Sequence, residues 1–186
     1  MPVSLRLIIL LLIGLLGLGC DRQKDTSEQA APVAAEVAKG VDRSHKGAAA
    51  PAVTFRDPDG GDISLADFRG NPVLVNLWAS WCAPCVKELP TLDKLAERHA
   101  IDGQLGVIAV SQDIGPQSSV EAFLAQHKIA HIGAFHDPEM ALTSVLAVQI
   151  MPTTVLYDAA GKEVWRFTGD LDWTSAEAAK LLSEAR

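Results

Sequence analysis

The sequence predicts an α/β domain with a mixed central sheet and helices on both of its faces. Apolar runs of strand length alternate with segments of helical periodicity, a pattern that favours parallel strands joined by crossover helices. Near the C-terminus, two further apolar runs are separated only by a tight turn, which indicates an antiparallel strand pair. Parallel and antiparallel strands are therefore expected in one sheet.

The domain is expected to begin near Pro51. Residues 53–55 have the alternation of a half-buried strand, and residues 57–61 have the composition of a turn. Ile63 and Leu65 then predict a second strand or extended segment.

A strand–helix–strand unit forms the centre of the predicted domain. Residues 73–78 are almost continuously apolar, which is typical of a parallel strand buried on both faces. A helix is expected from just past Cys85 to about His99, with a kink or a restarted turn at Pro90. Residues 105–110 are the next predicted buried strand.

The remaining elements follow in order along the chain. They are a helix capped by Ser118 or Ser119 and ending near His127, a short helix opened by Asp137 and Pro138 and reaching about Leu146, a strand over 153–157, its hairpin partner over 163–167, and a closing helix over 173–185.

Composition and charge narrow the class of function. Apolar residues make up 48% of the 186 residues, which is enough to bury a core, and the formal net charge is −7. A nucleic-acid-binding domain needs a basic patch, so no nucleic-acid partner is expected.

The N-terminus has the pattern of an export signal. Arg6 precedes an uncharged run over residues 7–19, which fits a signal-peptide core and is shorter than the roughly 20 residues of a spanning helix. Small residues then lead to Cys20. This pattern resembles the bacterial lipoprotein signal, in which the cysteine becomes the acylated first residue, although Gly17 stands where that signal usually has Leu. A lipoprotein, an uncleaved membrane anchor and plain secretion all remain open, and each places the domain outside the cytoplasm.

The segment after Cys20 is expected to be a tether. Asp21 resembles the signal that retains lipoproteins in the inner membrane, and it also fits a solvated linker charge. Residues 21–50 contain no aromatic residue and no sustained apolar periodicity. The predicted organisation is a signal peptide over 1–19, a lipidated Cys20 and flexible tether over 20–50, and one domain over 51–186.

Three cysteines, Cys20, Cys82 and Cys85, point to redox chemistry. An odd number in an exported protein leaves one thiol to explain, and lipidation of Cys20 would explain it. A domain of this size does not need a disulfide in order to fold, so a single CxxC pair indicates redox work.

The CxxC pair stands between a predicted strand and a predicted helix. The unpaired N–H groups and the positive dipole at a helix N-terminus both stabilise a thiolate. Thiol pKa values of roughly 3.5 to 7.5 in such settings make Cys82 a competent nucleophile. Pro84 suits the first helical turn and stiffens the link between the two sulfurs.

Three alternatives have weaker support in the sequence. A zinc site needs four ligands, and only one Cys pair is present, with the histidines at 45, 99, 127, 131 and 136 in the tether, at helix ends or in loops. No metal or other cofactor is therefore expected. A peroxiredoxin-type peroxidase would carry Pro and Thr or Ser shortly before the reactive cysteine, where Val75 and Ala79 stand. A non-catalytic binding module with an inert disulfide remains open.

Four groups of residues together carry a resemblance to a known family. They are LADFRG at 65–70, VNLWASWCAPC at 75–85, Glu88 with Pro90, and MPTT at 151–154. From about Pro51 onward the chain resembles the thioredoxin superfamily and, within its Redoxin-like clade, the TlpA/ResA-type extracytoplasmic thiol–disulfide oxidoreductases. The resemblance implies a thioredoxin-like fold with an N-terminal strand extension and a central insertion over about 115–140.

The resemblance also implies a docking surface beside the dithiol. It places Pro152 in a cis peptide bond facing the dithiol, with the Met151 backbone free to pair with an extended substrate. The residues alone favour an ordinary trans proline at the start of a strand. Trp81, Pro84, Met151 and Pro152 would form the apolar docking surface, although Trp81 fits core packing equally well.

Glu88 is the candidate proton carrier. Cytoplasmic-type thioredoxins manage the proton of the second cysteine with a buried Asp and a nearby Lys, and the resemblance places Asn76 and Ala109 at those positions. Glu88 shares a helix face with Cys85, and burial would raise its pKa into a useful range. A solvated acid in the first helical turn is the alternative.

The implied reaction is thiol–disulfide exchange, in which Cys82 attacks a substrate disulfide and Cys85 resolves the mixed disulfide. The resemblance favours a reductase, recharged by a membrane thiol–disulfide carrier and acting on apo-cytochrome c or other exported proteins. Ala83 and Pro84 do not separate a reductase from an oxidase.

Overall fold

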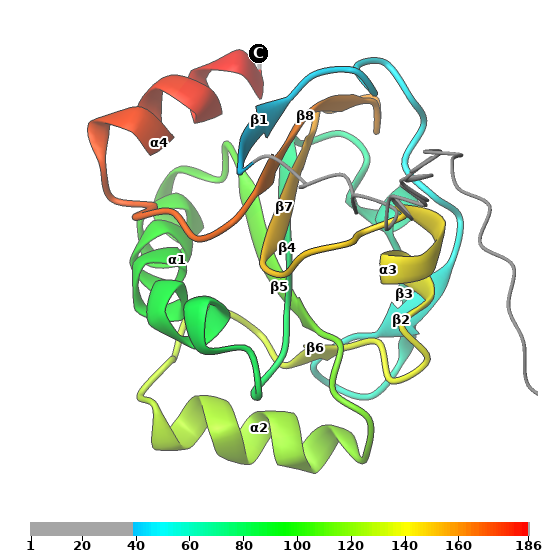
Figure 1. Ribbon diagram of the computed structural model, residues 1–186, viewed down its shortest axis with the longest axis vertical. Helices are drawn as coiled ribbons and strands as arrows, with labels where there is room; N and C mark the ends of the chain where they lie inside the picture. Colours follow the sequence, from blue (N-terminus) through cyan, green and yellow to red (C-terminus); the bar gives the residue numbers. More distant parts are fainter. Residues whose placement is uncertain (1–38, 186) are drawn as a thin grey trace, which may run out of the picture. The chain divides into compact units, whose positions relative to one another are not determined.

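The computed structural model describes residues 39–185 (Figure 1). The predicted signal peptide, Cys20 and most of the predicted tether lie outside these residues. One mixed sheet runs through the domain in the order β1-β8-β7-β4-β5-β6-β2-β3. Its strands are β1 (Gly40–Asp42), β2 (Thr54–Arg56), β3 (Asp62–Ser64), β4 (Val73–Trp78), β5 (Gly106–Ser111), β6 (Phe135–His136), β7 (Thr153–Tyr157) and β8 (Glu163–Thr168).

The centre of the sheet has the predicted topology. Strand β4 pairs with β5 in parallel over six residues and with β7 antiparallel, and β7 pairs antiparallel with β8. Every residue of β4 is buried, because helices cover both of its faces. This explains the continuous apolar run in its sequence.

Alternate residues of β4 enter two different cores. Leu74 and Trp78 belong to the core that contains buried residues of α1 (Ala83–Asp102), α2 (Gln117–Gln126) and α4 (Ala176–Leu182). Val75 and Leu77 belong to the core beneath α3 (Ala141–Val145) and the 3₁₀ helix η1 (Leu65–Phe68). Figure 1 shows α1 and α4 on one side of the sheet and α3 on the other, which confirms the predicted layers.

The folded part begins before the expected boundary at Pro51. Strand β1 pairs with β8, with Val41 opposite Phe167, and Ala49 forms a bridge with Lys162. Residues 40–42 and Ala49, expected as tether, therefore pair with the sheet, and a turn over residues 44–47 lies between them. Strand β1 has only one apolar side chain, so its place depends on main-chain hydrogen bonds that leave little trace in the sequence pattern.

Two further elements differ from expectation. Leu65, expected in a strand or extended segment, opens η1, where the Asp67 carboxylate accepts hydrogen bonds from the backbone and hydroxyl of Ser64. Strand β6, which was not expected, lies between β5 and β2 and joins the β2–β3 hairpin to the sheet.

Three helices differ in detail from those expected from the sequence. Helix α1 runs through Pro90 without interruption. Helix α2 starts after Pro116 rather than at Ser118 or Ser119. The Asp137 carboxylate accepts hydrogen bonds from the first two N–H groups of α3, so that helix begins four residues beyond Asp137.

The closing helix is shorter than predicted. Helix α4 starts after Ser175, whose hydroxyl accepts a hydrogen bond from Ala178 N, and a 3₁₀ turn, η2 (Ser183–Ala185), follows it. Trp173 therefore lies before the helix. Within residues 39–185, no helix combines the length and apolar character needed to cross a bilayer.

Candidate active site

Cys82 and Cys85 form a disulfide at the N-terminus of α1. Cys82 is the N-cap residue, and its Sγ accepts a hydrogen bond from Cys85 N at 3.3 Å. In the dithiol form this N–H and the helix dipole would stabilise a thiolate on residue 82. Cys82 is 6% exposed and Cys85 is fully buried, so an incoming disulfide meets the sulfur of Cys82 first.

The loop before the disulfide is held by Asp113, which sequence reasoning missed. The carboxylate of Asp113 accepts hydrogen bonds from Ser80 N at 3.0 Å, Ser80 Oγ at 2.8 Å and Ser111 Oγ at 2.8 Å. It follows β5, which is parallel to β4, so the carboxyl ends of both strands meet at the same edge of the sheet. An acidic residue just past a buried parallel strand is the signal that could have identified it.

A groove of about 390 Å³ opens beside the disulfide. One wall is residues 81–84, and the other is formed by residues 148–151 with Thr143. Trp81 is 68% exposed, which excludes the core-packing alternative. Three of the four predicted docking residues, Trp81, Pro84 and Met151, line this groove.

The fourth predicted docking residue, Pro152, lies next to the groove but is not part of its lining. Pro152 is buried, and the Met151–Pro152 peptide bond is cis, as the resemblance implied. The carbonyl oxygen of Pro152 accepts a hydrogen bond from Gly169 N at 2.9 Å. Met151 is therefore the member of this pair that a bound segment would contact.

The far wall of the groove is fixed by a helix cap and an ion pair. Helix α3 ends in a Schellman motif, with hydrogen bonds from Ala147 N to Ser144 O and from Val148 N to Thr143 O. Ala147 adopts φ 52°, a left-handed conformation that usually belongs to glycine. Arg166 binds the carbonyl oxygen of Leu146 at 2.8 Å, and its guanidinium is itself paired with buried Glu163.

Glu88 lies on the buried face of α1, one turn past Cys85, with 3% of its surface exposed. Its Oε1 accepts a hydrogen bond from Asn76 Nδ2 at 2.7 Å, and its Oε2 accepts hydrogen bonds from Leu171 N at 3.1 Å and Trp173 Nε1 at 3.2 Å. Burial raises the pKa of Glu88 to about 7, against the opposing effect of these three donors. The solvated-acid alternative is therefore wrong.

Asn76 occupies the centre of the sheet, with Ala109 opposite on β5 and Thr154 opposite on β7. Its amide donates to Thr154 Oγ1 at 2.9 Å as well as to Glu88. Its Oδ1 is buried and has no hydrogen-bond partner in the described part of the chain. Because Ala109 offers only a methyl group, no lysine stands at this position, and Glu88 is the ionisable group on the helix side of Asn76.

Within residues 39–185, no group of three or more His, Cys, Asp or Glu side chains is arranged to hold an ion.

A CxxC disulfide at a helix N-terminus, following a buried strand of a mixed thioredoxin-like sheet, defines a thiol–disulfide oxidoreductase. The Redoxin family model matches residues 45–182, so the chain belongs to the Redoxin family. The TlpA/ResA resemblance and the oxidoreductase activity predicted from the sequence are confirmed by its relatives.

Two of these relatives are thiol-disulfide oxidoreductases named ResA. A protein from Bacillus cereus is 31% identical over 124 residues, covering 67% of this chain and 70% of that protein. The protein from Bacillus subtilis (strain 168) is 29% identical over 133 residues, covering 71% and 72%.

Solved structures agree with this assignment. The structure of a thiol:disulfide interchange protein DsbE from Chlorobium tepidum has a TM-score of 0.65 and 26% identity, and the match covers 76% of this chain and 98% of that one. StoA from Bacillus subtilis has a TM-score of 0.57 and 25% identity, covering 73% and 100%.

Proposed function

We propose that this oxidoreductase is a disulfide reductase that acts on exported proteins while tethered outside the cytoplasm. The observation that carries the proposal is the asymmetry of the two cysteines. Cys82 borders an open groove, whereas Cys85 is fully buried on the helix face that also carries Glu88. An attacking sulfur at the surface and a resolving sulfur in the interior suit a two-step exchange.

In the first step, the Cys82 thiolate attacks one sulfur of a substrate disulfide. The bond between the substrate sulfurs breaks, a mixed disulfide with Cys82 forms, and the other substrate sulfur leaves as a thiolate that takes a proton from water. In the second step, Glu88 accepts the proton of Cys85, and the Cys85 thiolate attacks Cys82. The Cys82–Cys85 bond forms, and the second substrate sulfur leaves as a thiolate. Two electrons pass from the protein dithiol to the substrate.

Glu88 suits the proton transfer because its pKa is about 7, close to the pH at which it would act. In its ionised state it can take a proton from a buried thiol, and in its neutral state it can return that proton when the disulfide is reduced again. A membrane thiol–disulfide carrier would supply the electrons for that reduction.

The groove would hold an extended segment of the client. Trp81, Pro84 and Met151 offer apolar contact, and the Met151 backbone would pair with the segment as a short added strand. An apo-cytochrome c suits this chemistry, since the two thiols of its CxxCH motif must be reduced before haem attachment.

The tether would be a lipid on Cys20. The support for it is the sequence pattern: an apolar run over residues 7–19, small residues before the cysteine and Asp21 after it. A Cys20→Ala variant should no longer be recovered in the membrane fraction of cells. Mass spectrometry of the purified wild-type protein should find an acylated N-terminal cysteine. Recovery of the variant in the membrane fraction would favour an uncleaved anchor.

Insulin reduction with a dithiol donor tests the catalytic proposal directly. Cys82→Ser should abolish turnover, and Cys85→Ser should accumulate a mixed disulfide that can be isolated. A reductase should have a potential near that of thioredoxin, about −270 mV, rather than near −120 mV as in a strong oxidant. Full turnover in Cys82→Ser would exclude the mechanism, and an inert wild-type dithiol would favour the non-catalytic binding module.

A further inference from the structure

The connection between β8 and α4, residues 169–175, contributes to the environment of Glu88 from a distant part of the sequence. Figure 1 shows this connection passing beside α1 before α4 begins. Its Leu171 N and Trp173 Nε1 both donate to Oε2 of Glu88, at 3.1 and 3.2 Å. The backbone N–H of Trp173 donates to Thr91 Oγ1 at 3.1 Å, which fixes the connection to α1 one turn past Glu88.

The two oxygens of the Glu88 carboxylate are therefore unequal. A carboxylate oxygen has two lone pairs. Both lone pairs of Oε2 are occupied by N–H donors, whereas Oε1 accepts only from Asn76 Nδ2 and keeps one lone pair free. A proton that arrives at the carboxylate without displacing a donor can bind only to Oε1.

We propose that Trp173 is a positioning residue of the active site, whose indole N–H, together with Leu171 N–H, occupies Oε2 and leaves Oε1 as the atom that takes the Cys85 proton. The inference rests on the proposed function, in which Glu88 accepts that proton. The same hydrogen bond favours the ionised carboxylate, so it also keeps the pKa of Glu88 lower than burial alone would set it.

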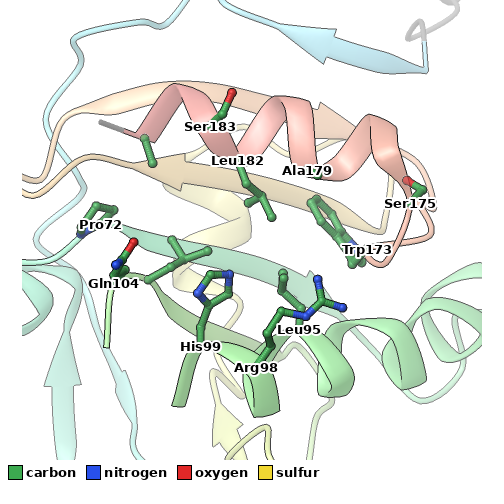
Figure 2. Close-up of a pocket in the computed structure, with 12 residues that line it drawn as sticks. Pro72, Leu95, Arg98, His99, Gln104, Trp173, Ser175, Ala179, Leu182 and Ser183 are labelled. Atoms are coloured by element: carbon green, nitrogen blue, oxygen red, sulfur yellow. The ribbon is translucent and has the colours of Figure 1, made fainter. Parts of the chain in front are cut away.

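The indole of Trp173 is buried in the core that contains α1 and α4. Trp173 is 1% exposed and meets Phe167 edge to face, with ring centroids 6.5 Å apart. Figure 2 shows the indole at the border of a cavity of about 300 Å³, which Leu95, Ala179 and Leu182 also line. The contact with Phe167 and the hydrogen bond from Nε1 to Glu88 together orient the indole N–H.

Few charged groups lie near Glu88 to influence the pKa of its carboxylate. Asp170 is the charged neighbour from the connection itself, and it raises the pKa of Glu88, while its own carboxylate is paired with Lys87 at 3.0 Å and with Lys39 at 4.0 Å. From α1, Cys85 and Cys82 titrate once reduced. Strands β4 and β7 present the neutral groups Asn76 and Thr154. Within residues 39–185, no cation lies within ion-pair distance of Glu88, so neutral N–H donors alone stabilise its carboxylate.

The test is a Trp173→Phe variant compared with Trp165→Phe. Trp165 is also fully buried and also loses one indole hydrogen bond, to Leu181 O at 3.1 Å, but it makes no hydrogen bond to Glu88. The readout is the titration of the Glu88 carboxyl carbon by ¹³C NMR in the oxidised protein, with the signal assigned by its loss in Glu88→Gln. Trp173→Phe should raise the titration midpoint by about one pH unit, and Trp165→Phe should leave it unchanged.

An unchanged midpoint in Trp173→Phe, or an equal shift in Trp165→Phe, would overturn the inference. If Trp173→Phe does not fold, Trp173→benzothienylalanine replaces the N–H by sulfur in a ring of the same shape and should give the same shift. The titration needs no substrate. If the wild-type protein is inactive, the proposed function is wrong, but the titration is unaffected. If the wild-type protein is active and the titration midpoint of Trp173→Phe is unchanged, only the role of Trp173 is wrong.

The rate of the resolving step provides a second readout. Its pH profile, followed from a preformed mixed disulfide, should move to higher pH in Trp173→Phe by the same amount as the titration midpoint. In a Glu88→Gln background, the Trp173→Phe change should move nothing further. A shift that persists without Glu88 would show that Trp173 acts through the fold, which would contradict the inference.

Discussion

A hydrogen bond of 2.7 Å joins the side-chain amide of Asn76 to the carboxylate of Glu88, and both side chains are almost fully excluded from solvent. The partner of this buried acid is therefore a neutral dipole rather than a cation. A neutral donor offsets part of the desolvation cost of the carboxylate and leaves the pKa of Glu88 free to rise to about 7.

Replacing the amide with a second carboxylate should disrupt this balance. In Asn76→Asp, two acids would share the buried site, and repulsion would raise the upper apparent pKa of the pair above that of Glu88 alone. The pH profile of insulin reduction should move to higher pH by at least about one unit. Thr154→Val, which removes the other side-chain partner of Asn76 and adds no charge, is the control. An Asn76→Asp profile that overlays the wild type would contradict this account.

The stability of the oxidised protein should fall as pH rises from about 4.5 to 7. Glu88 has a folded-state pKa of about 7 against an ordinary value of 4.5, so in this range the folded protein holds a proton that the unfolded chain has released. The loss should total about 3 kcal/mol and level off above pH 7.

Urea unfolding of the wild type and of Glu88→Gln across this pH range provides the measurement. The unfolding free energy of the wild type, relative to that of Glu88→Gln, should fall as pH rises. A constant difference in stability caused by the substitution does not affect this trend. A difference that stays constant from pH 4.5 to 8 would show that the carboxyl of Glu88 does not titrate as described.

Asp113→Ala should weaken both the fold and the catalytic loop. It removes the acceptor of hydrogen bonds from Ser80 N, Ser80 Oγ and Ser111 Oγ, which should cost about 1–3 kcal/mol of stability. Insulin reduction should also slow severalfold, because Trp81 and Cys82 follow directly on this loop.

Asp158→Ala is the matched control, since Asp158 accepts hydrogen bonds from Ala160 N and Lys162 N in the turn between β7 and β8. It should lower stability and leave turnover unchanged. An equal loss of turnover in the two variants would remove the specific role of Asp113.

Ala147→Gly should stabilise the protein. The left-handed conformation of Ala147 costs about 1–2 kcal/mol, and glycine adopts it freely at the expense of about 0.4–1 kcal/mol of extra unfolded-state entropy. The net gain should be roughly 0.5 kcal/mol in urea unfolding. The same change at Ala122, in the interior of α2, should instead cost about 0.5–1 kcal/mol. A loss of stability in Ala147→Gly would contradict the prediction.

The sequence allowed the central elements to be predicted because burial alone specifies them. Strands β4, β5, β7 and β8 each bury several apolar side chains, and α1 repeats Leu89, Leu92 and Leu95 at helical spacing. Strands β1 and β6 have three and two residues, and hydrogen bonds to distant segments place them. A periodicity argument cannot identify elements so short.

The same division applies to the site. Cys82, Cys85 and Glu88 could be identified because they lie within one short stretch of helix. Asp113 and Trp173 were missed, because they reach the site from parts of the chain 33 and 85 residues away from their partners. Trp173 was expected to start the closing helix. The available clue was that the N–H of a buried indole, such as that of Trp173, needs a hydrogen-bond acceptor.

Both margins of the sheet are three-residue strands, β1 and β3, each with a single apolar side chain and an aspartate. Long edge strands with free main-chain groups pair with strands of other chains, whereas short, charged edge strands do not. An unfolded substrate chain with exposed apolar segments would therefore find few main-chain groups to pair with at these two edge strands. Such an enzyme could work among unfolded chains at high local density without co-aggregating with them.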